Sequence, residues 1–350
     1  MRRLTVTLAA LAITVAACDA TQPSVDAPTP AAPNEIDTVF VAPDGDEAAR
    51  GTAEAPVRSL ERALEILLPG GTVVLADGIH RSGHHLTGIT GVTITGMPGS
   101  ILDGGGVEPL GIYCEGCKDV IIENLEIRGF TDIGVGASNS TGVTFRGLHV
   151  HGNGNTVQLV DWELEGYGIH VDFSSTVTIE FNDVHNNGPD PPVPPDRILG
   201  TGIDTFGNTD VAIRGNSSHE NHGGGILVED SFRVVVEDNE VFGNDLDASI
   251  DGWWDGGMWL DGGGDIIVRG NVFRNNKGPG IEISDEDGQS PTGYVLTDNA
   301  STGNYYGIFI WNFGTDEFPP PEILTLDGND FTGNDRLDIW IEPDLWWHRV

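Results

Sequence analysis

Positive charge is scarce in this chain. Its 350 residues include 17 lysines and arginines against 54 aspartates and glutamates, which gives a formal net charge of −37. Two of the arginines, Arg2 and Arg3, stand at the N-terminus, and no basic patch follows them. A protein that binds nucleic acid or an anionic membrane surface needs such a patch. We therefore expect neither as a partner.

Cysteine is also rare, with three in the chain. Cys114 and Cys117 form a C-x-x-C pair, but a thioredoxin-like redox motif needs a βαβ context that this region lacks. A four-thiolate zinc site would need two more cysteines. We interpret both residues as structural, either joined in a disulfide or packed as small apolar groups.

An apolar run from Leu4 to Ala17 follows Arg2 and Arg3. It has the length and charge order of a secretory signal rather than of a membrane span. The run ends in Val15-Ala16-Ala17-Cys18, which resembles a bacterial lipobox, and the resemblance implies cleavage before Cys18 and lipidation of that cysteine. An ordinary signal peptide with a chance cysteine is the alternative.

The chain after the signal divides into two parts. Residues 19–35 are rich in Pro, Ala and Thr and have no apolar period, which predicts a flexible tether. We therefore predict a signal peptide at 1–17, a lipidated cysteine and tether at 18–35, and one folded domain at 36–350. The mature protein is expected outside the cytoplasm, attached to the bacterial cell envelope only through its lipid, and monomeric.

Asparagine recurs in two columns down the second half of the chain, in units that each begin at a glycine followed by an apolar residue. The glycines are Gly168, Gly202, Gly225, Gly257, Gly280 and Gly307; the first column is Asn182, Asn216, Asn239, Asn271, Asn299 and Asn329; the second is Asn187, Asn221, Asn244, Asn276, Asn304 and Asn334. Self-similarity at a period near 23 residues predicts a solenoid. Asparagine suits its turns and can hydrogen-bond the asparagine of the next coil.

Alternation of apolar residues in each unit predicts parallel strands stacked ~4.8 Å apart, as in a β-helix of about nine or ten coils. Before the first strands, residues 56–68 place Leu60, Ala63, Leu64 and Leu67 on one helical face after Ser59. This spacing predicts a short helix that caps the open end of the stack.

The repeat from about Gly111 to the end, together with the segment Phe40–Arg81, resembles the right-handed parallel β-helices of the pectate-lyase type. The resemblance implies an all-β, right-handed parallel β-helix and favours polysaccharide lyase or epimerase chemistry. Enzyme signatures are poor, however. Asn208-Thr209-Asp210 matches the first motif of polygalacturonase-like hydrolases, but the later motifs do not follow, and the outward Arg or Lys set of the lyases is missing.

The strand after each anchor glycine is predicted to carry carboxylates and aromatic rings on its outer side, a combination that binds sugars. The predicted catalytic residues are His170, Asp172, Asp204, Glu229 and Asp261. The predicted substrate-binding residues are Tyr113, Phe206, Trp259, Glu282 and Trp311, and Trp162, Arg197, Trp253 and Trp254 from three long insertions. The alternative is an acidic, solvated sheet on which aromatics cover neighbouring strands.

Those insertions, Gly154–Tyr167, Gly188–Thr201 and Asp245–Gly256, all leave the coil at one corner and are expected to wall a groove. Residue spacing allows two reactions there. Carboxylates on neighbouring coils suit a hydrolase. A lyase would use calcium at Asp172, Glu229 and Asp261 and His170 or Tyr113 as base.

The sequence leaves hydrolase and lyase open, requires no cofactor other than this optional calcium, and predicts a polysaccharide as partner. A non-catalytic glycan-binding, adhesive or envelope scaffold protein is the alternative function.

Histidine forms one further column, at His151, His185 and His219, two residues before the second asparagine position. One imidazole per coil at ~4.8 Å could bind zinc or form a stacked surface ladder.

Overall fold

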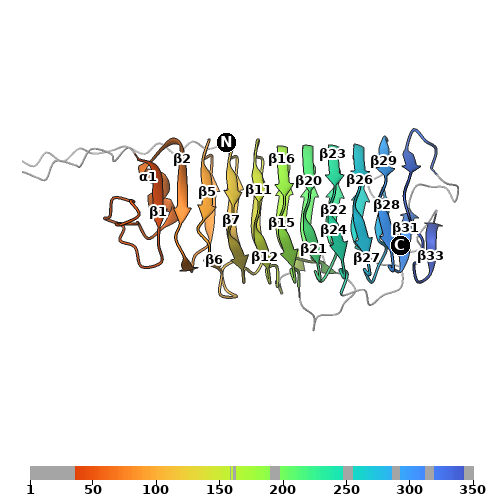
Figure 1. Cartoon of the computed structure of the whole chain (residues 1–350), viewed down its shortest axis with the longest axis horizontal. Coiled ribbons are helices and arrows are strands. Elements are labelled where there is room, and N and C mark those ends of the chain that lie inside the picture. The colour runs from red at the N-terminus through yellow and green to blue at the C-terminus, as the bar shows by residue number, and fades with distance from the viewer. Residues whose placement is uncertain are drawn as a thin grey trace, which may run out of the picture. The chain divides into compact units, whose positions relative to one another are not determined.

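The computed structural model describes residues 36–157, 159–160, 163–189, 198–246, 255–285, 292–311 and 319–342. Within this part, the chain winds through three long parallel sheets, so that strands from successive coils stand side by side along the long axis (Figure 1). This is the predicted right-handed parallel β-helix. The sheets contain eleven, ten and nine strands, in agreement with the predicted number of coils.

The strands of the first sheet are β1 (Ile36–Val41), β2 (Leu67–Leu75), β5 (Thr93–Gly96), β8 (Ile121–Glu123), β11 (Thr144–Arg146), β16 (Ser175–Glu180), β20 (Thr209–Arg214), β23 (Phe232–Glu237), β26 (Gly264–Arg269), β29 (Tyr294–Thr297) and β32 (Leu324–Asp327). The strands of the second sheet are β4 (His84–Thr87), β7 (Leu110–Glu115), β10 (Ile133–Ser138), β15 (Tyr167–Asp172), β19 (Ile203–Phe206), β22 (Ile226–Glu229), β25 (Met258–Asp261), β28 (Ile281–Ser284), β31 (Tyr306–Trp311) and β33 (Leu337–Glu342). The strands of the third sheet are β3 (Gly78–His80), β6 (Ser100–Asp103), β9 (Glu126–Arg128), β12 (His149–His151), β17 (Asp183–His185), β21 (Ser217–His219), β24 (Glu240–Phe242), β27 (Val272–Arg274) and β30 (Ala300–Thr302).

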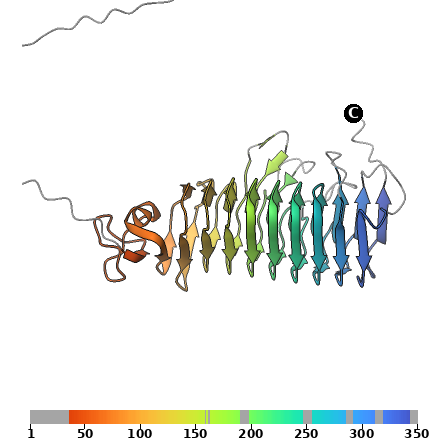
Figure 2. The same ribbon diagram turned by 90° about the horizontal axis from the view of Figure 1, so that it is seen from above.

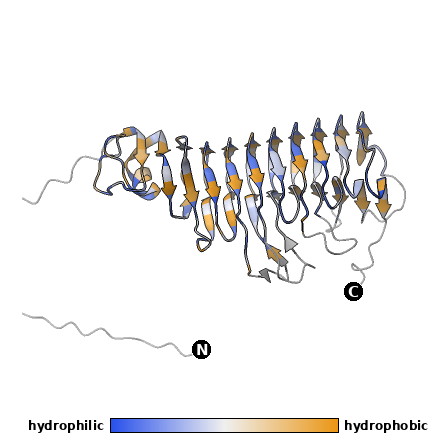
Figure 3. Ribbon diagram, turned by 60° about the horizontal axis from the view of Figure 1, so that its bottom comes forward, coloured by the Kyte–Doolittle hydropathy of each residue, from blue (hydrophilic) through white to orange (hydrophobic). Residues whose placement is uncertain are grey.

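The core is a column of aliphatic side chains that repeats from coil to coil. Ile169 and Val171 are fully buried, as the alternation predicts. Val177, Val211, Val234 and Ile266 lie directly above one another in the first sheet, and each is at most 2% exposed. Figure 3 shows hydrophobic stretches recurring along the strands of successive coils.

The two asparagine columns are buried hydrogen-bonded ladders. In the first, Asn216 Nδ2 donates to Ile179 O and to Asn239 Oδ1, both at 2.9 Å, while its Oδ1 accepts from Asn182 N and Nδ2 at 3.0 Å. The second ladder has the same pattern and begins one coil earlier than the sequence pattern suggested, at Asn153, whose Nδ2 donates to Asn187 Oδ1 at 3.1 Å. The amides therefore satisfy buried turns that have no access to water.

The anchor glycines are required by the same ladder. A Cβ on Gly168 would lie 2.7 Å from Gly202 O and 2.8 Å from Asn187 Nδ2. Any side chain at this position would displace the neighbouring coil or the asparagine. The glycine column and the second asparagine column are thus one packing unit.

The predicted capping helix is present but shorter than expected. Helix α1 spans Leu60–Ile66 instead of 56–68, and the Ser59 side chain caps it by accepting from Arg62 N at 3.2 Å. Leu67 already has extended backbone angles, and β2 runs on through the Pro69-Gly70-Gly71 segment that was expected to end the helix. His84 Nδ1 lies 2.8 Å from Glu61 Oε1 and ties the helix to β4.

Cys114 and Cys117 are free thiols, both at most 2% exposed within the core. Of the two predicted structural alternatives, packing as small apolar groups is the one found.

Asn216→Ala should destabilise the β-helix by at least about 2 kcal/mol, because it leaves several buried polar groups without partners. Urea denaturation followed by circular dichroism measures this. Asn139→Gly is a matched control, since Asn139 is exposed, lies outside both ladders and has φ 50°, which glycine tolerates. Equal losses in the two variants would contradict the role of the ladder.

Candidate functional site

The outer side of the second sheet carries two rows of side chains in strict register. The first row contains Tyr113, Gly136, His170, Asp204, Leu227, Trp259, Glu282 and Phe309. The second row contains Glu115, Ser138, Asp172, Phe206, Glu229, Asp261 and Ser284. These pairings match the register predicted from the anchor glycines.

His170 and Asp204 form the tightest polar contact on this face. They are opposite each other on β15 and β19, and His170 Nδ1 donates to Asp204 Oδ2 at 2.5 Å. The side chains of His170 and Asp204 are 17% and 3% exposed. Burial alone would lower the pKa of His170, but the Asp204 carboxylate outweighs it and raises that pKa above its usual value. The pair therefore stabilises the imidazolium form.

The second carboxylate oxygen of Asp204, Oδ1, is buried and has no hydrogen-bond partner among the described residues. A buried carboxylate oxygen normally has a donor. This oxygen therefore has unused acceptor capacity, although it is shielded from the surface.

Tyr167, which was not among the predicted site residues, completes the surroundings of His170. Its ring stacks on the imidazole at 4.7 Å between centroids, and its hydroxyl donates to Glu165 Oε2 at 3.4 Å. Burial, followed by the charges of Asp204, Glu165 and Glu229, raises its pKa well above 10. The signal was weak, because Tyr167 precedes the anchor glycine at a corner where other coils carry Leu110 or Ile133.

Two of the predicted insertions form a small sheet beside this face. Strands β13 (Leu159–Val160) and β14 (Glu163–Glu165) of the first insertion pair antiparallel, and β14 pairs parallel with β18 (Ile198–Leu199) of the second. Figure 2 shows these short strands projecting from the stack. The predicted site residues Trp162, Arg197, Trp253 and Trp254 lie outside the described residues, as does Cys18.

The aromatic residues towards the C-terminal end of the face are buried, contrary to the prediction that they are exposed. Trp259, Phe309 and Trp311 are 8%, 1% and 4% exposed and pack with Leu227 and Tyr306 in a second apolar cluster. Alternation directs these rings away from the helix core, but they then pack on one another. They are part of the packing rather than open stacking platforms.

Two acidic residues beside this apolar cluster, Asp261 and Glu282, accept hydrogen bonds from neighbouring side chains. Trp259 Nε1 donates to Ser284 Oγ at 2.7 Å, and Ser284 Oγ donates to Asp261 Oδ1 at 2.5 Å. Trp311 Nε1 donates to Glu282 Oε1. Asp261 and Glu282 are only 5% and 2% exposed. These contacts give both carboxylates a structural role.

The five predicted catalytic residues do not converge on one point. Asp172 and Asp261 belong to strands three coils apart, which is about 14 Å at the rung spacing of a sheet. Acid and base must both reach one bond, so a single site cannot include both. His170, Asp172 and Asp204 do lie together, with Glu229 on the next coil.

Phe206 stands between Asp172 and Glu229 in the second row. The ligand atoms of Asp172, Glu229 and Asp261 do not all lie within 4.8 Å of one another. The geometry therefore gives no support to a calcium ion shared by these three residues.

Tyr113 is poorly suited to act as a base. Burial, then the charge of Asp172, raises its pKa to about 12. Its hydroxyl donates weakly to Asp172 Oδ1 at 3.5 Å, which orients that carboxylate.

The partial hydrolase motif lies elsewhere, because Thr209 and Asp210 are on β20 of the first sheet. Asp210 pairs there with Arg233. The motif therefore lies apart from the candidate site on the second sheet.

The structure contains the predicted histidine column, which lies on the third sheet. His151, His185 and His219 are in register, and their rings stack at 5.1 and 4.8 Å. The stack continues onto Phe242, under the Arg274 guanidinium. His149, which the column did not include, lies beside it with its Nε2 at 2.8 Å from His185 Nε2.

Two family models match this chain. The model described as "Right handed beta helix region" matches residues 77–252, half of the chain. The chain belongs to the right-handed β-helix family. The model described as "Periplasmic copper-binding protein (NosD)" matches residues 165–340, also half of the chain, so this β-helix protein belongs to that family as well. No curated protein sequence matches it.

Solved structures with the same fold are distant in sequence. The pectate lyase Pel9A is 15% identical, with a TM-score of 0.59 over 86% of this chain and 79% of that chain. The GH136 lacto-N-biosidase from Eubacterium ramulus is 15% identical, with a TM-score of 0.60 over 87% and 68%. At this identity the likeness shows the β-helix fold. In the described part of this β-helix protein, no helix has the length and apolar character needed to cross a membrane.

Asp204→Asn should lower the pKa of His170, because burial remains while the largest of the charges that raise this pKa is removed. NMR titration of the imidazole resonances measures this shift. Asp261→Asn, on a distant coil, should leave the His170 titration unchanged. An unaltered pKa in Asp204→Asn would contradict the assigned coupling.

Proposed function

We propose that this β-helix protein is an exported, lipid-anchored protein of the bacterial cell envelope that binds and hydrolyses a neutral polysaccharide above His170. The observation that carries the proposal is the buried pair of His170 and Asp204 with Asp172 beside it on one outer face. A histidine whose imidazolium form is stabilised by one carboxylate and lies beside a second one is equipped for general acid–base catalysis. Export and lipidation rest on the N-terminal signal and Cys18, and the word "periplasmic" in the matching family's name agrees with export.

The charge of the face supports a neutral substrate. None of the ten strands of the second sheet contains a lysine or arginine, whereas Glu115, Asp172, Asp204 and Glu229 all lie on its outer side. Such a surface repels uronates. The lyase or epimerase alternative would therefore need a cation that these strands do not provide.

The placement of His170 and Asp172 is compatible with inversion. They are two residues apart on β15, so their side chains point to the same side from backbone positions about 6.6 Å apart. An inverting hydrolase needs enough room between its acid and base groups, ~6.5 to 9.5 Å in enzymes with two carboxyl groups, to admit a water molecule. We assign Glu229, one coil from Asp204 and two from Asp172, to substrate contact instead of its predicted catalytic role.

In the proposed reaction, the His170 imidazolium gives its proton to the glycosidic oxygen as the bond to the anomeric carbon breaks. Asp172 takes a proton from the water that attacks this carbon. Asp204 stabilises the charged imidazole before the transfer and fixes the orientation of the ring. The proton on Asp172 then returns to His170 through solvent, so water is the only reactant consumed.

The similar structures are compatible with this substrate class. One is named a pectate lyase and the other a lacto-N-biosidase, so the same fold carries enzymes that act on carbohydrates. The likeness does not choose between the reactions. That choice rests on the acidic face and the position of His170.

A panel of neutral and uronate polysaccharides, tested with and without calcium, examines the proposal. We expect new reducing ends from a neutral glycan, independent of calcium, with inversion at the anomeric carbon. Asp172→Asn and His170→Gln should each lower the rate at least about 100-fold, the usual contribution of a general acid or base. Glycan affinity should change much less.

Glu115→Gln is the matched control, since Glu115 occupies the same row as Asp172 two coils away and is exposed. Its rate should remain near that of the wild type. Unsaturated products from uronates would show that the protein is a lyase and not a hydrolase. Binding without any cleavage would support the scaffold alternative and contradict the enzymatic role.

A further inference from the structure

The third sheet carries a second cluster of functional groups, unrelated to the proposed glycan site. His149 of β12 is paired in register with Asp183 of β17, and His185 lies diagonally across from His149. His149 Nε2 is 2.8 Å from His185 Nε2 and 4.0 Å from Asp183 Oδ2. Ligand atoms of all three residues lie within 4.8 Å of one another.

The protonation state of His185 follows from its neighbour Asn186. Asn186 Nδ2 donates to Glu220 O at 3.4 Å, so the oxygen of its amide is the atom that faces His185 Nδ1 at 2.7 Å. An amide oxygen only accepts, and His185 Nδ1 must therefore carry the proton. In the neutral ring this leaves the lone pair on Nε2, which points at His149.

This arrangement is typical of a metal-binding histidine. One ring nitrogen donates to a neighbouring oxygen, which fixes the tautomer and directs the other nitrogen at the ion. Without an ion, a single proton must sit between the two Nε2 atoms. An ion that replaces this proton would have both imidazoles as ligands.

Asp183 supplies a carboxylate in a similar way. Its Oδ1 lies 3.1 Å from His219 Nε2, which leaves Oδ2 on the side of His149. The His149 and Asp183 side chains are 44% and 52% exposed. Both also line an open hollow of about 450 Å³, which gives an ion and its remaining water ligands access.

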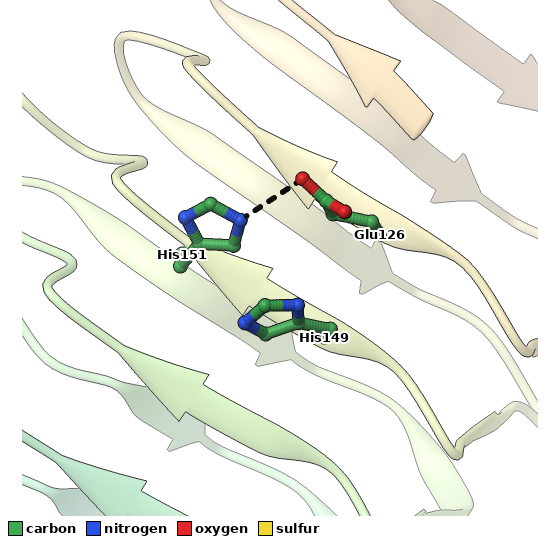
Figure 4. A group of neighbouring side chains, drawn as sticks. All are labelled: Glu126, His149 and His151. Carbon is green, nitrogen blue, oxygen red and sulfur yellow. Dashed lines mark hydrogen bonds and ion pairs between the residues drawn. The ribbon is translucent and has the colours of Figure 1, made fainter. Parts of the chain in front are cut away.

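Glu126 and His151 form a competing group with His149, drawn in Figure 4, and it is the weaker one. The dashed contact joins His151 Nε2 to Glu126 Oε1 at 3.3 Å. The same oxygen of Glu126 also accepts from Arg128 Nη1 at 2.8 Å. A carboxylate already paired with arginine is a poor metal ligand. Asp183 and His185 on the next coil are therefore the better partners for His149.

We propose that His149, Asp183 and His185 bind one divalent transition-metal ion of the kind that imidazole prefers, Zn²⁺ or Cu²⁺. Two imidazoles and one carboxylate are ligands that such ions accept, with water in the remaining position. Ligand nitrogens bound at ~2.0–2.1 Å in a tetrahedron lie about 3.3 Å apart, so the two rings need to separate by about 0.5 Å. Exposed side chains can make this adjustment.

Equilibrium dialysis of the untagged, chelator-treated chain against Zn²⁺ tests the proposal, and electron paramagnetic resonance of the Cu²⁺-loaded chain reports nitrogen ligands. We expect one equivalent of ion and imidazole hyperfine coupling. His149→Gln and His185→Gln should each weaken Zn²⁺ binding at least about 100-fold, since even outer-shell substitutions cost 10- to 100-fold.

Two further variants keep the result interpretable. Asn186→Gly removes only the group that orients His185, and glycine tolerates φ 53° at this position, so affinity should fall about 10-fold or more without unfolding. His85→Gln removes a histidine of the second sheet that is 52% exposed and should leave binding unchanged. No binding by the wild-type chain, or equal binding by the wild type and both ligand variants, would overturn the proposal.

Discussion

Hydrogen bonds between buried asparagine amides hold the coils from Asn153 to Asn334 in register with one another. A solenoid has to turn its backbone three times per coil, and turns leave peptide groups that cannot reach water. At Asn187, for example, Nδ2 donates both to Val150 O and to Asn221 Oδ1, so one side chain joins three coils. The pairing is possible only when coils are one rung apart, and a glycine must pack against the amide. The three long insertions begin directly after an asparagine of the second ladder, at Gly154, Gly188 and Asp245, so none of them interrupts a ladder.

This constraint places the functional groups. Because register is fixed, a residue on one coil has a defined neighbour on the next. His170 consequently meets Asp204 on the second sheet, and His149 meets Asp183 on the third. The two sheets use the same geometry for different chemistry. On the second, a carboxylate outweighs burial and favours the imidazolium form of His170, whereas on the third, a neighbouring amide directs one ring nitrogen of His185 towards a second imidazole.

Much of this could be predicted from periodicity. The asparagine and glycine columns predicted the sheets, the outward direction of His170 and the alignment of His151 with His185. The burial of Trp259 and Trp311 could not be predicted, because alternation gives the direction of a side chain and not what covers it. Phe206 separates Asp172 from Glu229, a consequence of register that the calcium hypothesis overlooked. The contacts of Tyr167 and of His149 depend on corner geometry and on rotamers, neither of which produces a periodic pattern in the sequence.

The central claim is that the outer face around His170 and Asp204 is where a glycan binds. A crystal structure of the protein with a neutral oligosaccharide, chosen as the shortest fragment that binds, tests this claim most directly. The account predicts a sugar on the second sheet, with a glycosidic oxygen beside His170 and the anomeric carbon on the side of Asp172. An oligosaccharide bound on the first or third sheet, with the second sheet empty, would contradict it.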